Sequence, residues 1–101
     1  MRLSQLEKDV LIANAIGQFG SQTALYLFGS RVNDQSKGGD IDVLIVPGNN
    51  MNASNLYHKK IQFLVKIKSS IEDQKIDVIV KNPNDNRNII ETAIKEGIRL
   101  C

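Results

Sequence analysis

Three short apolar runs rich in strand-forming residues alternate with segments of helical periodicity, and this alternation most constrains the fold. The runs cover residues 23–28, 40–46 and 76–80. The helical segments cover residues 4–20, about 54–70 and about 88–96. Because helices that alternate with strands cover a sheet, the order predicts one α/β (α+β) domain of two or three layers. The hairpin-like connection between the first two runs favours a mixed β-sheet over a fully parallel one.

The helical segments have recognisable ends. Ser4 and Glu7 form the pattern of a capping box, and Gly20 is a suitable stop. Gly97 ends the last helix. In the first helix, the apolar positions at helical spacing are Leu6, Val10, Ile12, Ala13, Ile16 and Phe19. In the second helix, the expected apolar stripe consists of Tyr57, Ile61, Leu64, Val65 and Ile71, with Tyr57 in the core.

Length and composition limit the kind of protein. The 101 residues fit a single domain, residues 1–101, and the 42% of apolar residues are enough for one core. The formal net charge is +2 and the basic residues are dispersed, which makes nucleic acid an unfavoured partner. Cys101 is the single cysteine and cannot form an internal disulfide. No apolar stretch is long enough for a membrane span, and the first nine residues are too charged for a signal peptide, so we expect a cytoplasmic protein.

Two carboxylates stand at the start of the second run. Residues two apart in a strand point to the same face, so Asp40 and Asp42 should project together while Ile41, Val43 and Ile45 point into the core. Neighbouring carboxylates raise each other's pKa unless a cation lies between them. Magnesium typically binds one or two carboxylates together with substrate phosphates. The pattern therefore predicts a magnesium site, and the alternative is a turn with two exposed acids.

A third acid, Asp77, lies near the start of the third run. An acid among buried strand residues is costly unless it is paired or binds a metal. If the third strand lies beside the second, Asp77 reaches the same face. Three acids suffice for a two-metal phosphoryl-transfer site with ions about 3.5–4 Å apart. One ion would hold the triphosphate and the other the acceptor oxygen, with Asp77 as a ligand that could help take the proton. The alternative is an ion pair between Asp77 and Lys75.

Gly29, Ser30 and Arg31 directly follow the first run. A glycine at a strand end lets the backbone approach a ligand closely, and Ser30 offers a hydroxyl and a backbone N–H group. A short helical turn here would aim N–H groups at phosphate, and Arg31 could contact the same phosphates as a fixed cation. We expect this turn to bind the nucleotide, the alternative being an ordinary turn with a solvated arginine.

These motifs resemble those of the polymerase-β-type nucleotidyltransferase superfamily and, more narrowly, of its minimal nucleotidyltransferase (MNT) group. The resemblance rests on residues 27–31, on residues 39–45 and on Asp77, and the ending at residues 94–100 is also similar. Gly-Ser and Asp-x-Asp are each weak signals alone and fairly specific at this spacing. The sequence departs from the group in two ways: the spacing between the serine and the first aspartate is one residue shorter than in many members, and the glycine usual after the serine is absent.

The resemblance implies a magnesium-dependent enzyme that uses ATP, with Asp40, Asp42 and Asp77 as its catalytic and metal-binding residues. It also implies a helical HEPN-type protein as partner, for which the chain acts as antitoxin by transferring AMP to a tyrosine of that toxin. Two other functions remain open. One is a non-catalytic antitoxin or scaffold that acts by protein binding. The other is a small-molecule nucleotidyltransferase, although such enzymes usually carry an additional domain.

Overall fold

The computed structural model describes residues 1, 3–33, 35, 39–71 and 75–101. Its elements in chain order are α1 (Gln5–Phe19), β1 (Ala24–Phe28), the 3-10 helix η1 (Gly29–Val32), β2 (Ile41–Val46), α2 (Ala53–Ser70), β3 (Ile76–Val80), α3 (Asn88–Glu96) and β4 (Ile98–Arg99). The three predicted helices and three predicted strands are confirmed. β4 was not predicted, because two residues are too few to show a periodic pattern. The predicted loop after Ser30 begins with the helical turn η1 and falls partly on residues 34 and 36–38, outside the described residues.

The four strands form one mixed sheet in the order β3-β2-β1-β4. β1 runs antiparallel to both β2 and β4, whereas β2 and β3 are parallel. Parallel neighbours need a crossover connection, and α2 provides it. The expected mixed sheet is therefore confirmed, and the starts of β2 and β3 come to lie at one end of the sheet, beside the end of β1.

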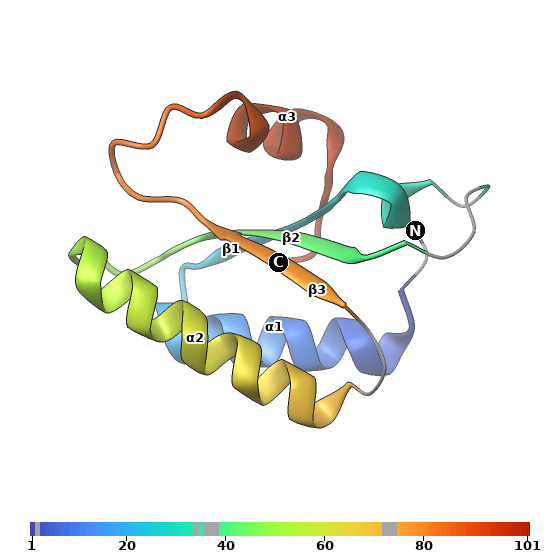
Figure 1. Ribbon diagram of the computed structural model, residues 1–101, viewed down its shortest axis with the longest axis horizontal. Coiled ribbons are helices and arrows are strands. Elements are labelled where there is room, and N and C mark those ends of the chain that lie inside the picture. Colours follow the sequence, from blue (N-terminus) through green and yellow to red (C-terminus); the bar gives the residue numbers. More distant parts are fainter. Residues whose placement is uncertain (2, 34, 36–38, 72–74) are drawn as a thin grey trace.

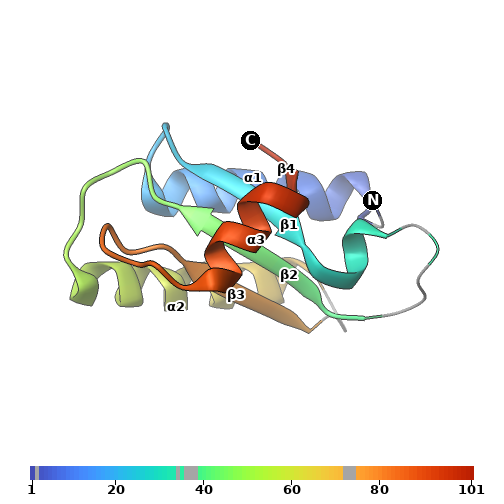
Figure 2. The ribbon, with the colours of Figure 1, turned by 90° about the horizontal axis from the view of Figure 1, so that it is seen from above.

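The helices cover both faces of this sheet. Figure 1 shows α1 and α2 below it and α3 above it, and Figure 2 shows α3 lying across the middle strands. The larger core lies on the side of α1 and α2, and its fully buried members include Leu11, Phe19, Leu27, Val43, Phe63 and Ile67. A smaller cluster on the α3 side consists of Leu44, Ile90 and Ala93. The result is a three-layer α/β domain.

The N-terminus of α1 follows the predicted capping pattern. The Ser4 hydroxyl accepts a hydrogen bond of 3.0 Å from the backbone N–H of Glu7, and the Ser4 backbone N–H donates one of 2.8 Å to the Glu7 carboxylate. Both bonds satisfy donors that the helix itself leaves unpaired. Gly20 ends the helix with φ of 110°, a conformation that favours glycine.

The predicted buried faces of the helices were partly wrong. In α2 the buried residues are Leu56, Phe63 and Ile67, whereas Tyr57 is 66% exposed and Val65 is 63% exposed. Ile71 is buried and Leu64 packs against the core, as predicted, but Tyr57, Ile61 and Val65 lie on a side turned about one residue, or 100°, from the buried one. In α1, likewise, Leu6 and Ile16 are exposed while Leu11, Ala15, Gln18 and Phe19 are buried. Apolar residues occupy more than one side of these helices, so contacts with neighbouring elements decide which side is buried.

Within the described part of the chain, no helix combines the length and the apolarity needed to cross a bilayer.

Candidate active site

The register of the sheet brings two of the three predicted acids side by side. Asp42 pairs with Asp77 across the parallel strands β2 and β3, and with Phe28 across the antiparallel strands β2 and β1. Ile41, Val43 and Ile45 are fully buried on the opposite face, as predicted. Alternation along β2 therefore places Asp42 on the same face as Leu44, the face that α3 covers. The two carboxylates lie beyond the apolar cluster, where the strands begin.

The electrostatic environment of Asp42 favours its neutral form. Burial raises the pKa of Asp42, and the neighbouring charges of Asp77 and Asp40 and a hydrogen bond with Asp77 raise this pKa further. The charge of Lys75 lowers the pKa, but it is the smallest of these influences. A half-buried acid crowded by neighbouring acids in this way is more typical of a functional site than of an isolated ion pair.

Asp40 stands directly before β2, and its side chain forms an ion pair. The carboxylate Oδ2 of Asp40 lies 3.6 Å from Nζ of Lys75, the residue that directly precedes β3. Lys75 therefore pairs with Asp40, and the alternative in which it pairs with Asp77 is not what the structure shows. The Asp40 side chain is 40% exposed and the Lys75 side chain is 73% exposed, so solvent screens this ion pair and it opens easily.

The glycine–serine turn lies against the same carboxylates. Gly29 has φ of 75°, and a Cβ atom placed on it would collide with Oδ2 of Asp42. Only glycine meets both requirements at this position, its positive φ and its contact with the carboxylate. Ser30 and Arg31 follow in η1, and Nε of Arg31 donates a hydrogen bond of 3.2 Å to the carbonyl oxygen of Gly39. This bond ties the turn to the residue just before Asp40.

The donor atoms suit a hard divalent cation. Asp42 and Asp77 supply only oxygen, and their mutual repulsion is what a bound cation relieves. Within the described residues, no group of three histidine, cysteine or acidic side chains has a geometry that could hold one metal ion in common. The reason visible at the site is that Asp40 faces Lys75 while the other two acids face each other. A shared three-carboxylate site therefore requires the Asp40 side chain to leave Lys75.

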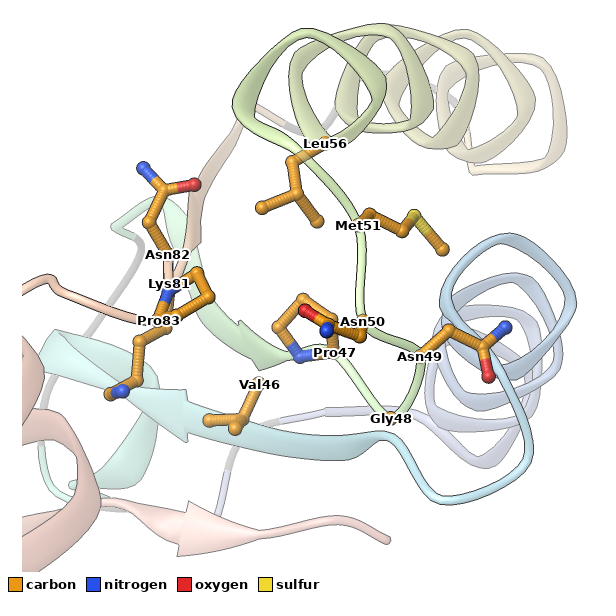
Figure 3. Close-up of a pocket in the computed structure, with 10 residues that line it drawn as sticks. All are labelled: Val46, Pro47, Gly48, Asn49, Asn50, Met51, Leu56, Lys81, Asn82 and Pro83. Atoms are coloured by element: carbon orange, nitrogen blue, oxygen red, sulfur yellow. The ribbon is translucent and has the colours of Figure 1, made fainter.

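A hollow at the other end of the sheet contains none of the predicted site residues. It measures about 260 Å³, and its walls come from the connection between β2 and α2 (residues 46–51), from Leu56 and from residues 81–83 (Figure 3). These segments follow the C-terminal ends of β2 and β3, whereas Asp42 and Asp77 lie near the N-terminal ends of the same strands. The hollow is therefore separate from the acidic site.

Sequence reasoning missed a larger cavity beside the glycine–serine turn. This cavity measures about 400 Å³ and lies between η1 and α3, with Gly29 on one wall and Glu96 on the other. Nothing in the sequence signals it, because residues more than 55 positions apart form it and only the packing of α3 on the sheet brings them together.

The mixed sheet, the adjoining acids and the glycine–serine turn together define a class: an α/β domain that gathers carboxylates and a glycine–serine turn at one end of its sheet. Residues 11–101 match the family described as "Polymerase beta, Nucleotidyltransferase". The chain belongs to this nucleotidyltransferase family, as the resemblance of its motifs indicated. None of the curated proteins matches the sequence.

Two solved structures share the fold at low sequence identity. One is a complex of a tri-AMPylated HEPN toxin with an MNT antitoxin from Shewanella oneidensis, with 17% identity, a TM-score of 0.62, and coverage of 96% of this chain and 71% of the other. The second is a toxin–antitoxin complex named MntA-HpeT that carries two aspartate-to-glutamate substitutions. It has 15% identity and a TM-score of 0.59, and the match covers 94% of this chain and 71% of the other. At these identities the likeness establishes the shared fold.

Proposed function

We propose that this chain transfers a nucleoside monophosphate, AMP from ATP, to a hydroxyl group of a partner protein in the cytoplasm. The observation that carries this proposal is the contact of Asp42 with Asp77, next to the turn at Gly29. The partner we expect is a helical HEPN-type protein, which the chain would neutralise as its antitoxin. Two similar folds occur in toxin–antitoxin complexes, and in one of them the toxin is AMPylated, which supports this choice.

Each predicted residue has a role in this reaction. Gly29 and Ser30 bind the triphosphate through the backbone and the hydroxyl, and Arg31 adds a positive charge beside it. The acceptor oxygen attacks the α-phosphorus, the bond from that phosphorus to the bridging oxygen breaks, and pyrophosphate leaves. The hydroxyl proton passes to Asp77. Asp77 suits this role because its side chain is exposed at the rim of the site, where an acceptor can reach it.

Asp42, Asp77 and Asp40 would hold magnesium, in the two-ion arrangement that a nucleotidyl transfer uses. The metal supplies Lewis-acid stabilisation of the charge that develops on the phosphate oxygens. The chain contributes the close approach of other carboxylates to Asp42. Because these negative charges repel one another, a cation bound among them is strongly stabilised. Asp40 would exchange its screened ion pair with Lys75 for this interaction.

The decisive experiment follows label from ATP that carries it on the α-phosphate. The protein, magnesium and the proposed HEPN-type partner are incubated together, and label on that partner is measured. Replacing Asp42 with alanine should lower transfer by at least about a hundredfold, since metal-assisted charge stabilisation is worth several kcal/mol. The Asp9→Ala variant, which changes an exposed acid on α1, is the matched control and should transfer label normally.

Complex formation, measured in the same samples, separates the alternatives. Label transfer that Asp42→Ala abolishes while the complex persists supports the enzyme. A tight complex that never acquires label supports a binding antitoxin instead. Transfer to an added small-molecule alcohol, with none to the partner, would support a small-molecule nucleotidyltransferase.

A further inference from the structure

The cavity between η1 and α3 adjoins the candidate active site. Both elements lie on the same side of the sheet (Figure 1), which is also the side that bears Asp42. The walls used in the argument are Phe28, Gly29 and Val32 from the β1–η1 segment, and Ile89, Thr92 and Glu96 from α3. Gly29 is part of both the cavity and the candidate active site, since it lines the cavity and lies against the carboxylate of Asp42. A nucleotide whose phosphates bind at the turn therefore has this cavity within reach of its other end.

The volume of the cavity suits a small organic ligand. Sites for such ligands measure about 300–1,000 Å³. The cavity between η1 and α3, at about 400 Å³, falls within that range, whereas the hollow of Figure 3, at about 260 Å³, falls below it. Size and position therefore both favour the cavity beside Gly29.

The walls of this cavity suit a flat ring better than a phosphate. Phe28 and Val32 are half-buried, and Ile89 leaves 45% of its surface exposed to the cavity and the solvent around it. Covering exposed apolar surface with a ring is favourable by about 25 cal/mol per Å². The wall contributed by α3 adds two polar groups, the hydroxyl of Thr92 and the carboxylate of Glu96.

Glu96 holds a negative charge where its helix disfavours one. It is the last residue of α3, and the C-terminal end of a helix favours cations over anions. Among the described residues, no lysine or arginine forms an ion pair with it. An ionised carboxylate only accepts hydrogen bonds. At this wall it would select a ring that presents an N–H donor, such as the amino group of adenine.

We propose that this cavity binds the base and ribose of the nucleoside triphosphate, and that Glu96 selects adenine by accepting a hydrogen bond from its amino group. The proposal rests on the proposed function, because it assigns the nucleoside subsite of the same reaction. It makes Glu96 a specificity-determining residue and leaves the chemistry at the phosphorus to the three aspartates.

Binding measurements test the role of Glu96 without relying on catalysis. Calorimetry compares the affinities for magnesium ATP and for the magnesium triphosphate of purine riboside, which lacks the amino group. The native protein should prefer ATP about tenfold, the value expected for one hydrogen bond to a charged group. Glu96→Gln should lower this preference to about threefold, because the neutral carbonyl of glutamine accepts a weaker hydrogen bond from the amino group than a carboxylate does, while the amide N–H can pair with the ring nitrogen of either base.

Glu91→Gln is the matched control for this substitution. Glu91 lies on the same helix, and the same charge is removed, but this residue lines a different hollow. The control variant should keep the native preference for ATP.

A second variant tests the cavity itself. Thr92 is exposed on α3, so tryptophan at this position should fill the cavity without disturbing the core. Thr92→Trp should weaken ATP binding at least about tenfold and leave the affinity for inorganic tripolyphosphate with magnesium unchanged. The unchanged tripolyphosphate affinity also shows that the variant is folded.

The outcomes separate this inference from the proposed function. Suppose that the native protein binds both ATP and tripolyphosphate. If the Glu96→Gln variant then keeps the native preference for ATP, and the Thr92→Trp variant keeps the native affinity for ATP, the nucleoside subsite alone is overturned. A native protein that binds neither ligand overturns the proposed function as well.

Discussion

Asp42, on which the proposed function most depends, works against the stability of the fold. Burial and the charges of Asp77 and Asp40 raise the pKa of Asp42, so the folded state favours the protonated carboxyl more than the unfolded chain does. A raised acid pKa contributes stability only at low pH, and this contribution is lost as the pH rises through the folded-state pKa. At neutral pH the ionised Asp42 therefore lowers the stability of the fold, and a cation bound beside it would relieve this cost.

Asp42→Asn should consequently stabilise the protein at neutral pH. Because solvent screens this half-buried group, we expect a gain below about 1 kcal/mol, or less than about 5 °C in Tm. The gain should shrink as the pH falls and vanish below the ordinary aspartate pKa of about 3.9, where Asp42 is protonated in both states. Thermal melts at several pH values measure it, with Asp9→Asn as the control. A variant less stable than the native protein at pH 7 would contradict this account.

Gly29 is a second residue whose identity the site dictates. Gly29→Ala should destabilise the protein by about 1–3 kcal/mol, since alanine disfavours the positive φ and its Cβ meets the Asp42 carboxylate. Gly17→Ala is the matched control: this glycine lies in α1, and a Cβ on it has no atom within 4 Å. Denaturant unfolding should show the control unchanged or stabilised by about 0.5–1 kcal/mol. Equal effects of the two substitutions would show that Gly29 is an ordinary turn residue.

At the scale of the elements, helical spacing predicts a helix better than it predicts the helix's buried face. α2 has apolar side chains around much of its circumference, and both the predicted stripe and the real one recur every three to four residues. The helix packs on α1 and on β3, and these contacts bury Phe63 and Ile67 while Tyr57 remains exposed. Substitutions on the buried side and on the exposed side of α2 should therefore change the free energy of unfolding by different amounts.

Phe63→Ala should destabilise the protein by about 3–5 kcal/mol, because Phe63 is fully buried and packs beside Phe19 with ring centroids 6.4 Å apart. Tyr57→Ala, on the same helix, should change the free energy of unfolding by less than about 0.5 kcal/mol, since this side chain is 66% exposed. Urea unfolding of both variants measures the difference. If the Tyr57 variant were the less stable of the two, the packing described for α2 would be wrong.

At the scale of the whole molecule, ligand binding should stabilise the entire domain. The candidate active site is formed by residues of β1, η1, β2 and β3, so unfolding of the domain destroys it. A ligand present at 100 times its Kd adds about 2.7 kcal/mol to the stability of the folded state. For a domain of 101 residues this corresponds to a rise in Tm of roughly 10–20 °C.

Magnesium ATP at saturating concentration should therefore raise Tm by about that amount. AMP lacks two of the phosphates that we propose the glycine–serine turn binds, so it should raise Tm much less, and chelation of magnesium should remove most of the ATP effect. Differential scanning fluorimetry provides the measurement. Equal shifts with AMP and ATP would place the binding energy outside the turn and the acids.

The sequence by itself determined the three helices, the three longer strands and the motifs from which the chemistry is proposed. Capping residues, turn glycines and hydrophobic periodicity act over a few neighbours, so the bounds of α1 and α3 and the two motifs could be predicted from local patterns. The pairing of Asp42 with Asp77 depended on the strand order, and only the sheet established that β2 and β3 are neighbours in this register. The tertiary structure alone also decided which face of α2 is buried, that Lys75 pairs with Asp40, and that α3 closes a cavity beside Gly29. These features depend on contacts between residues far apart in the chain, and no local pattern records such contacts.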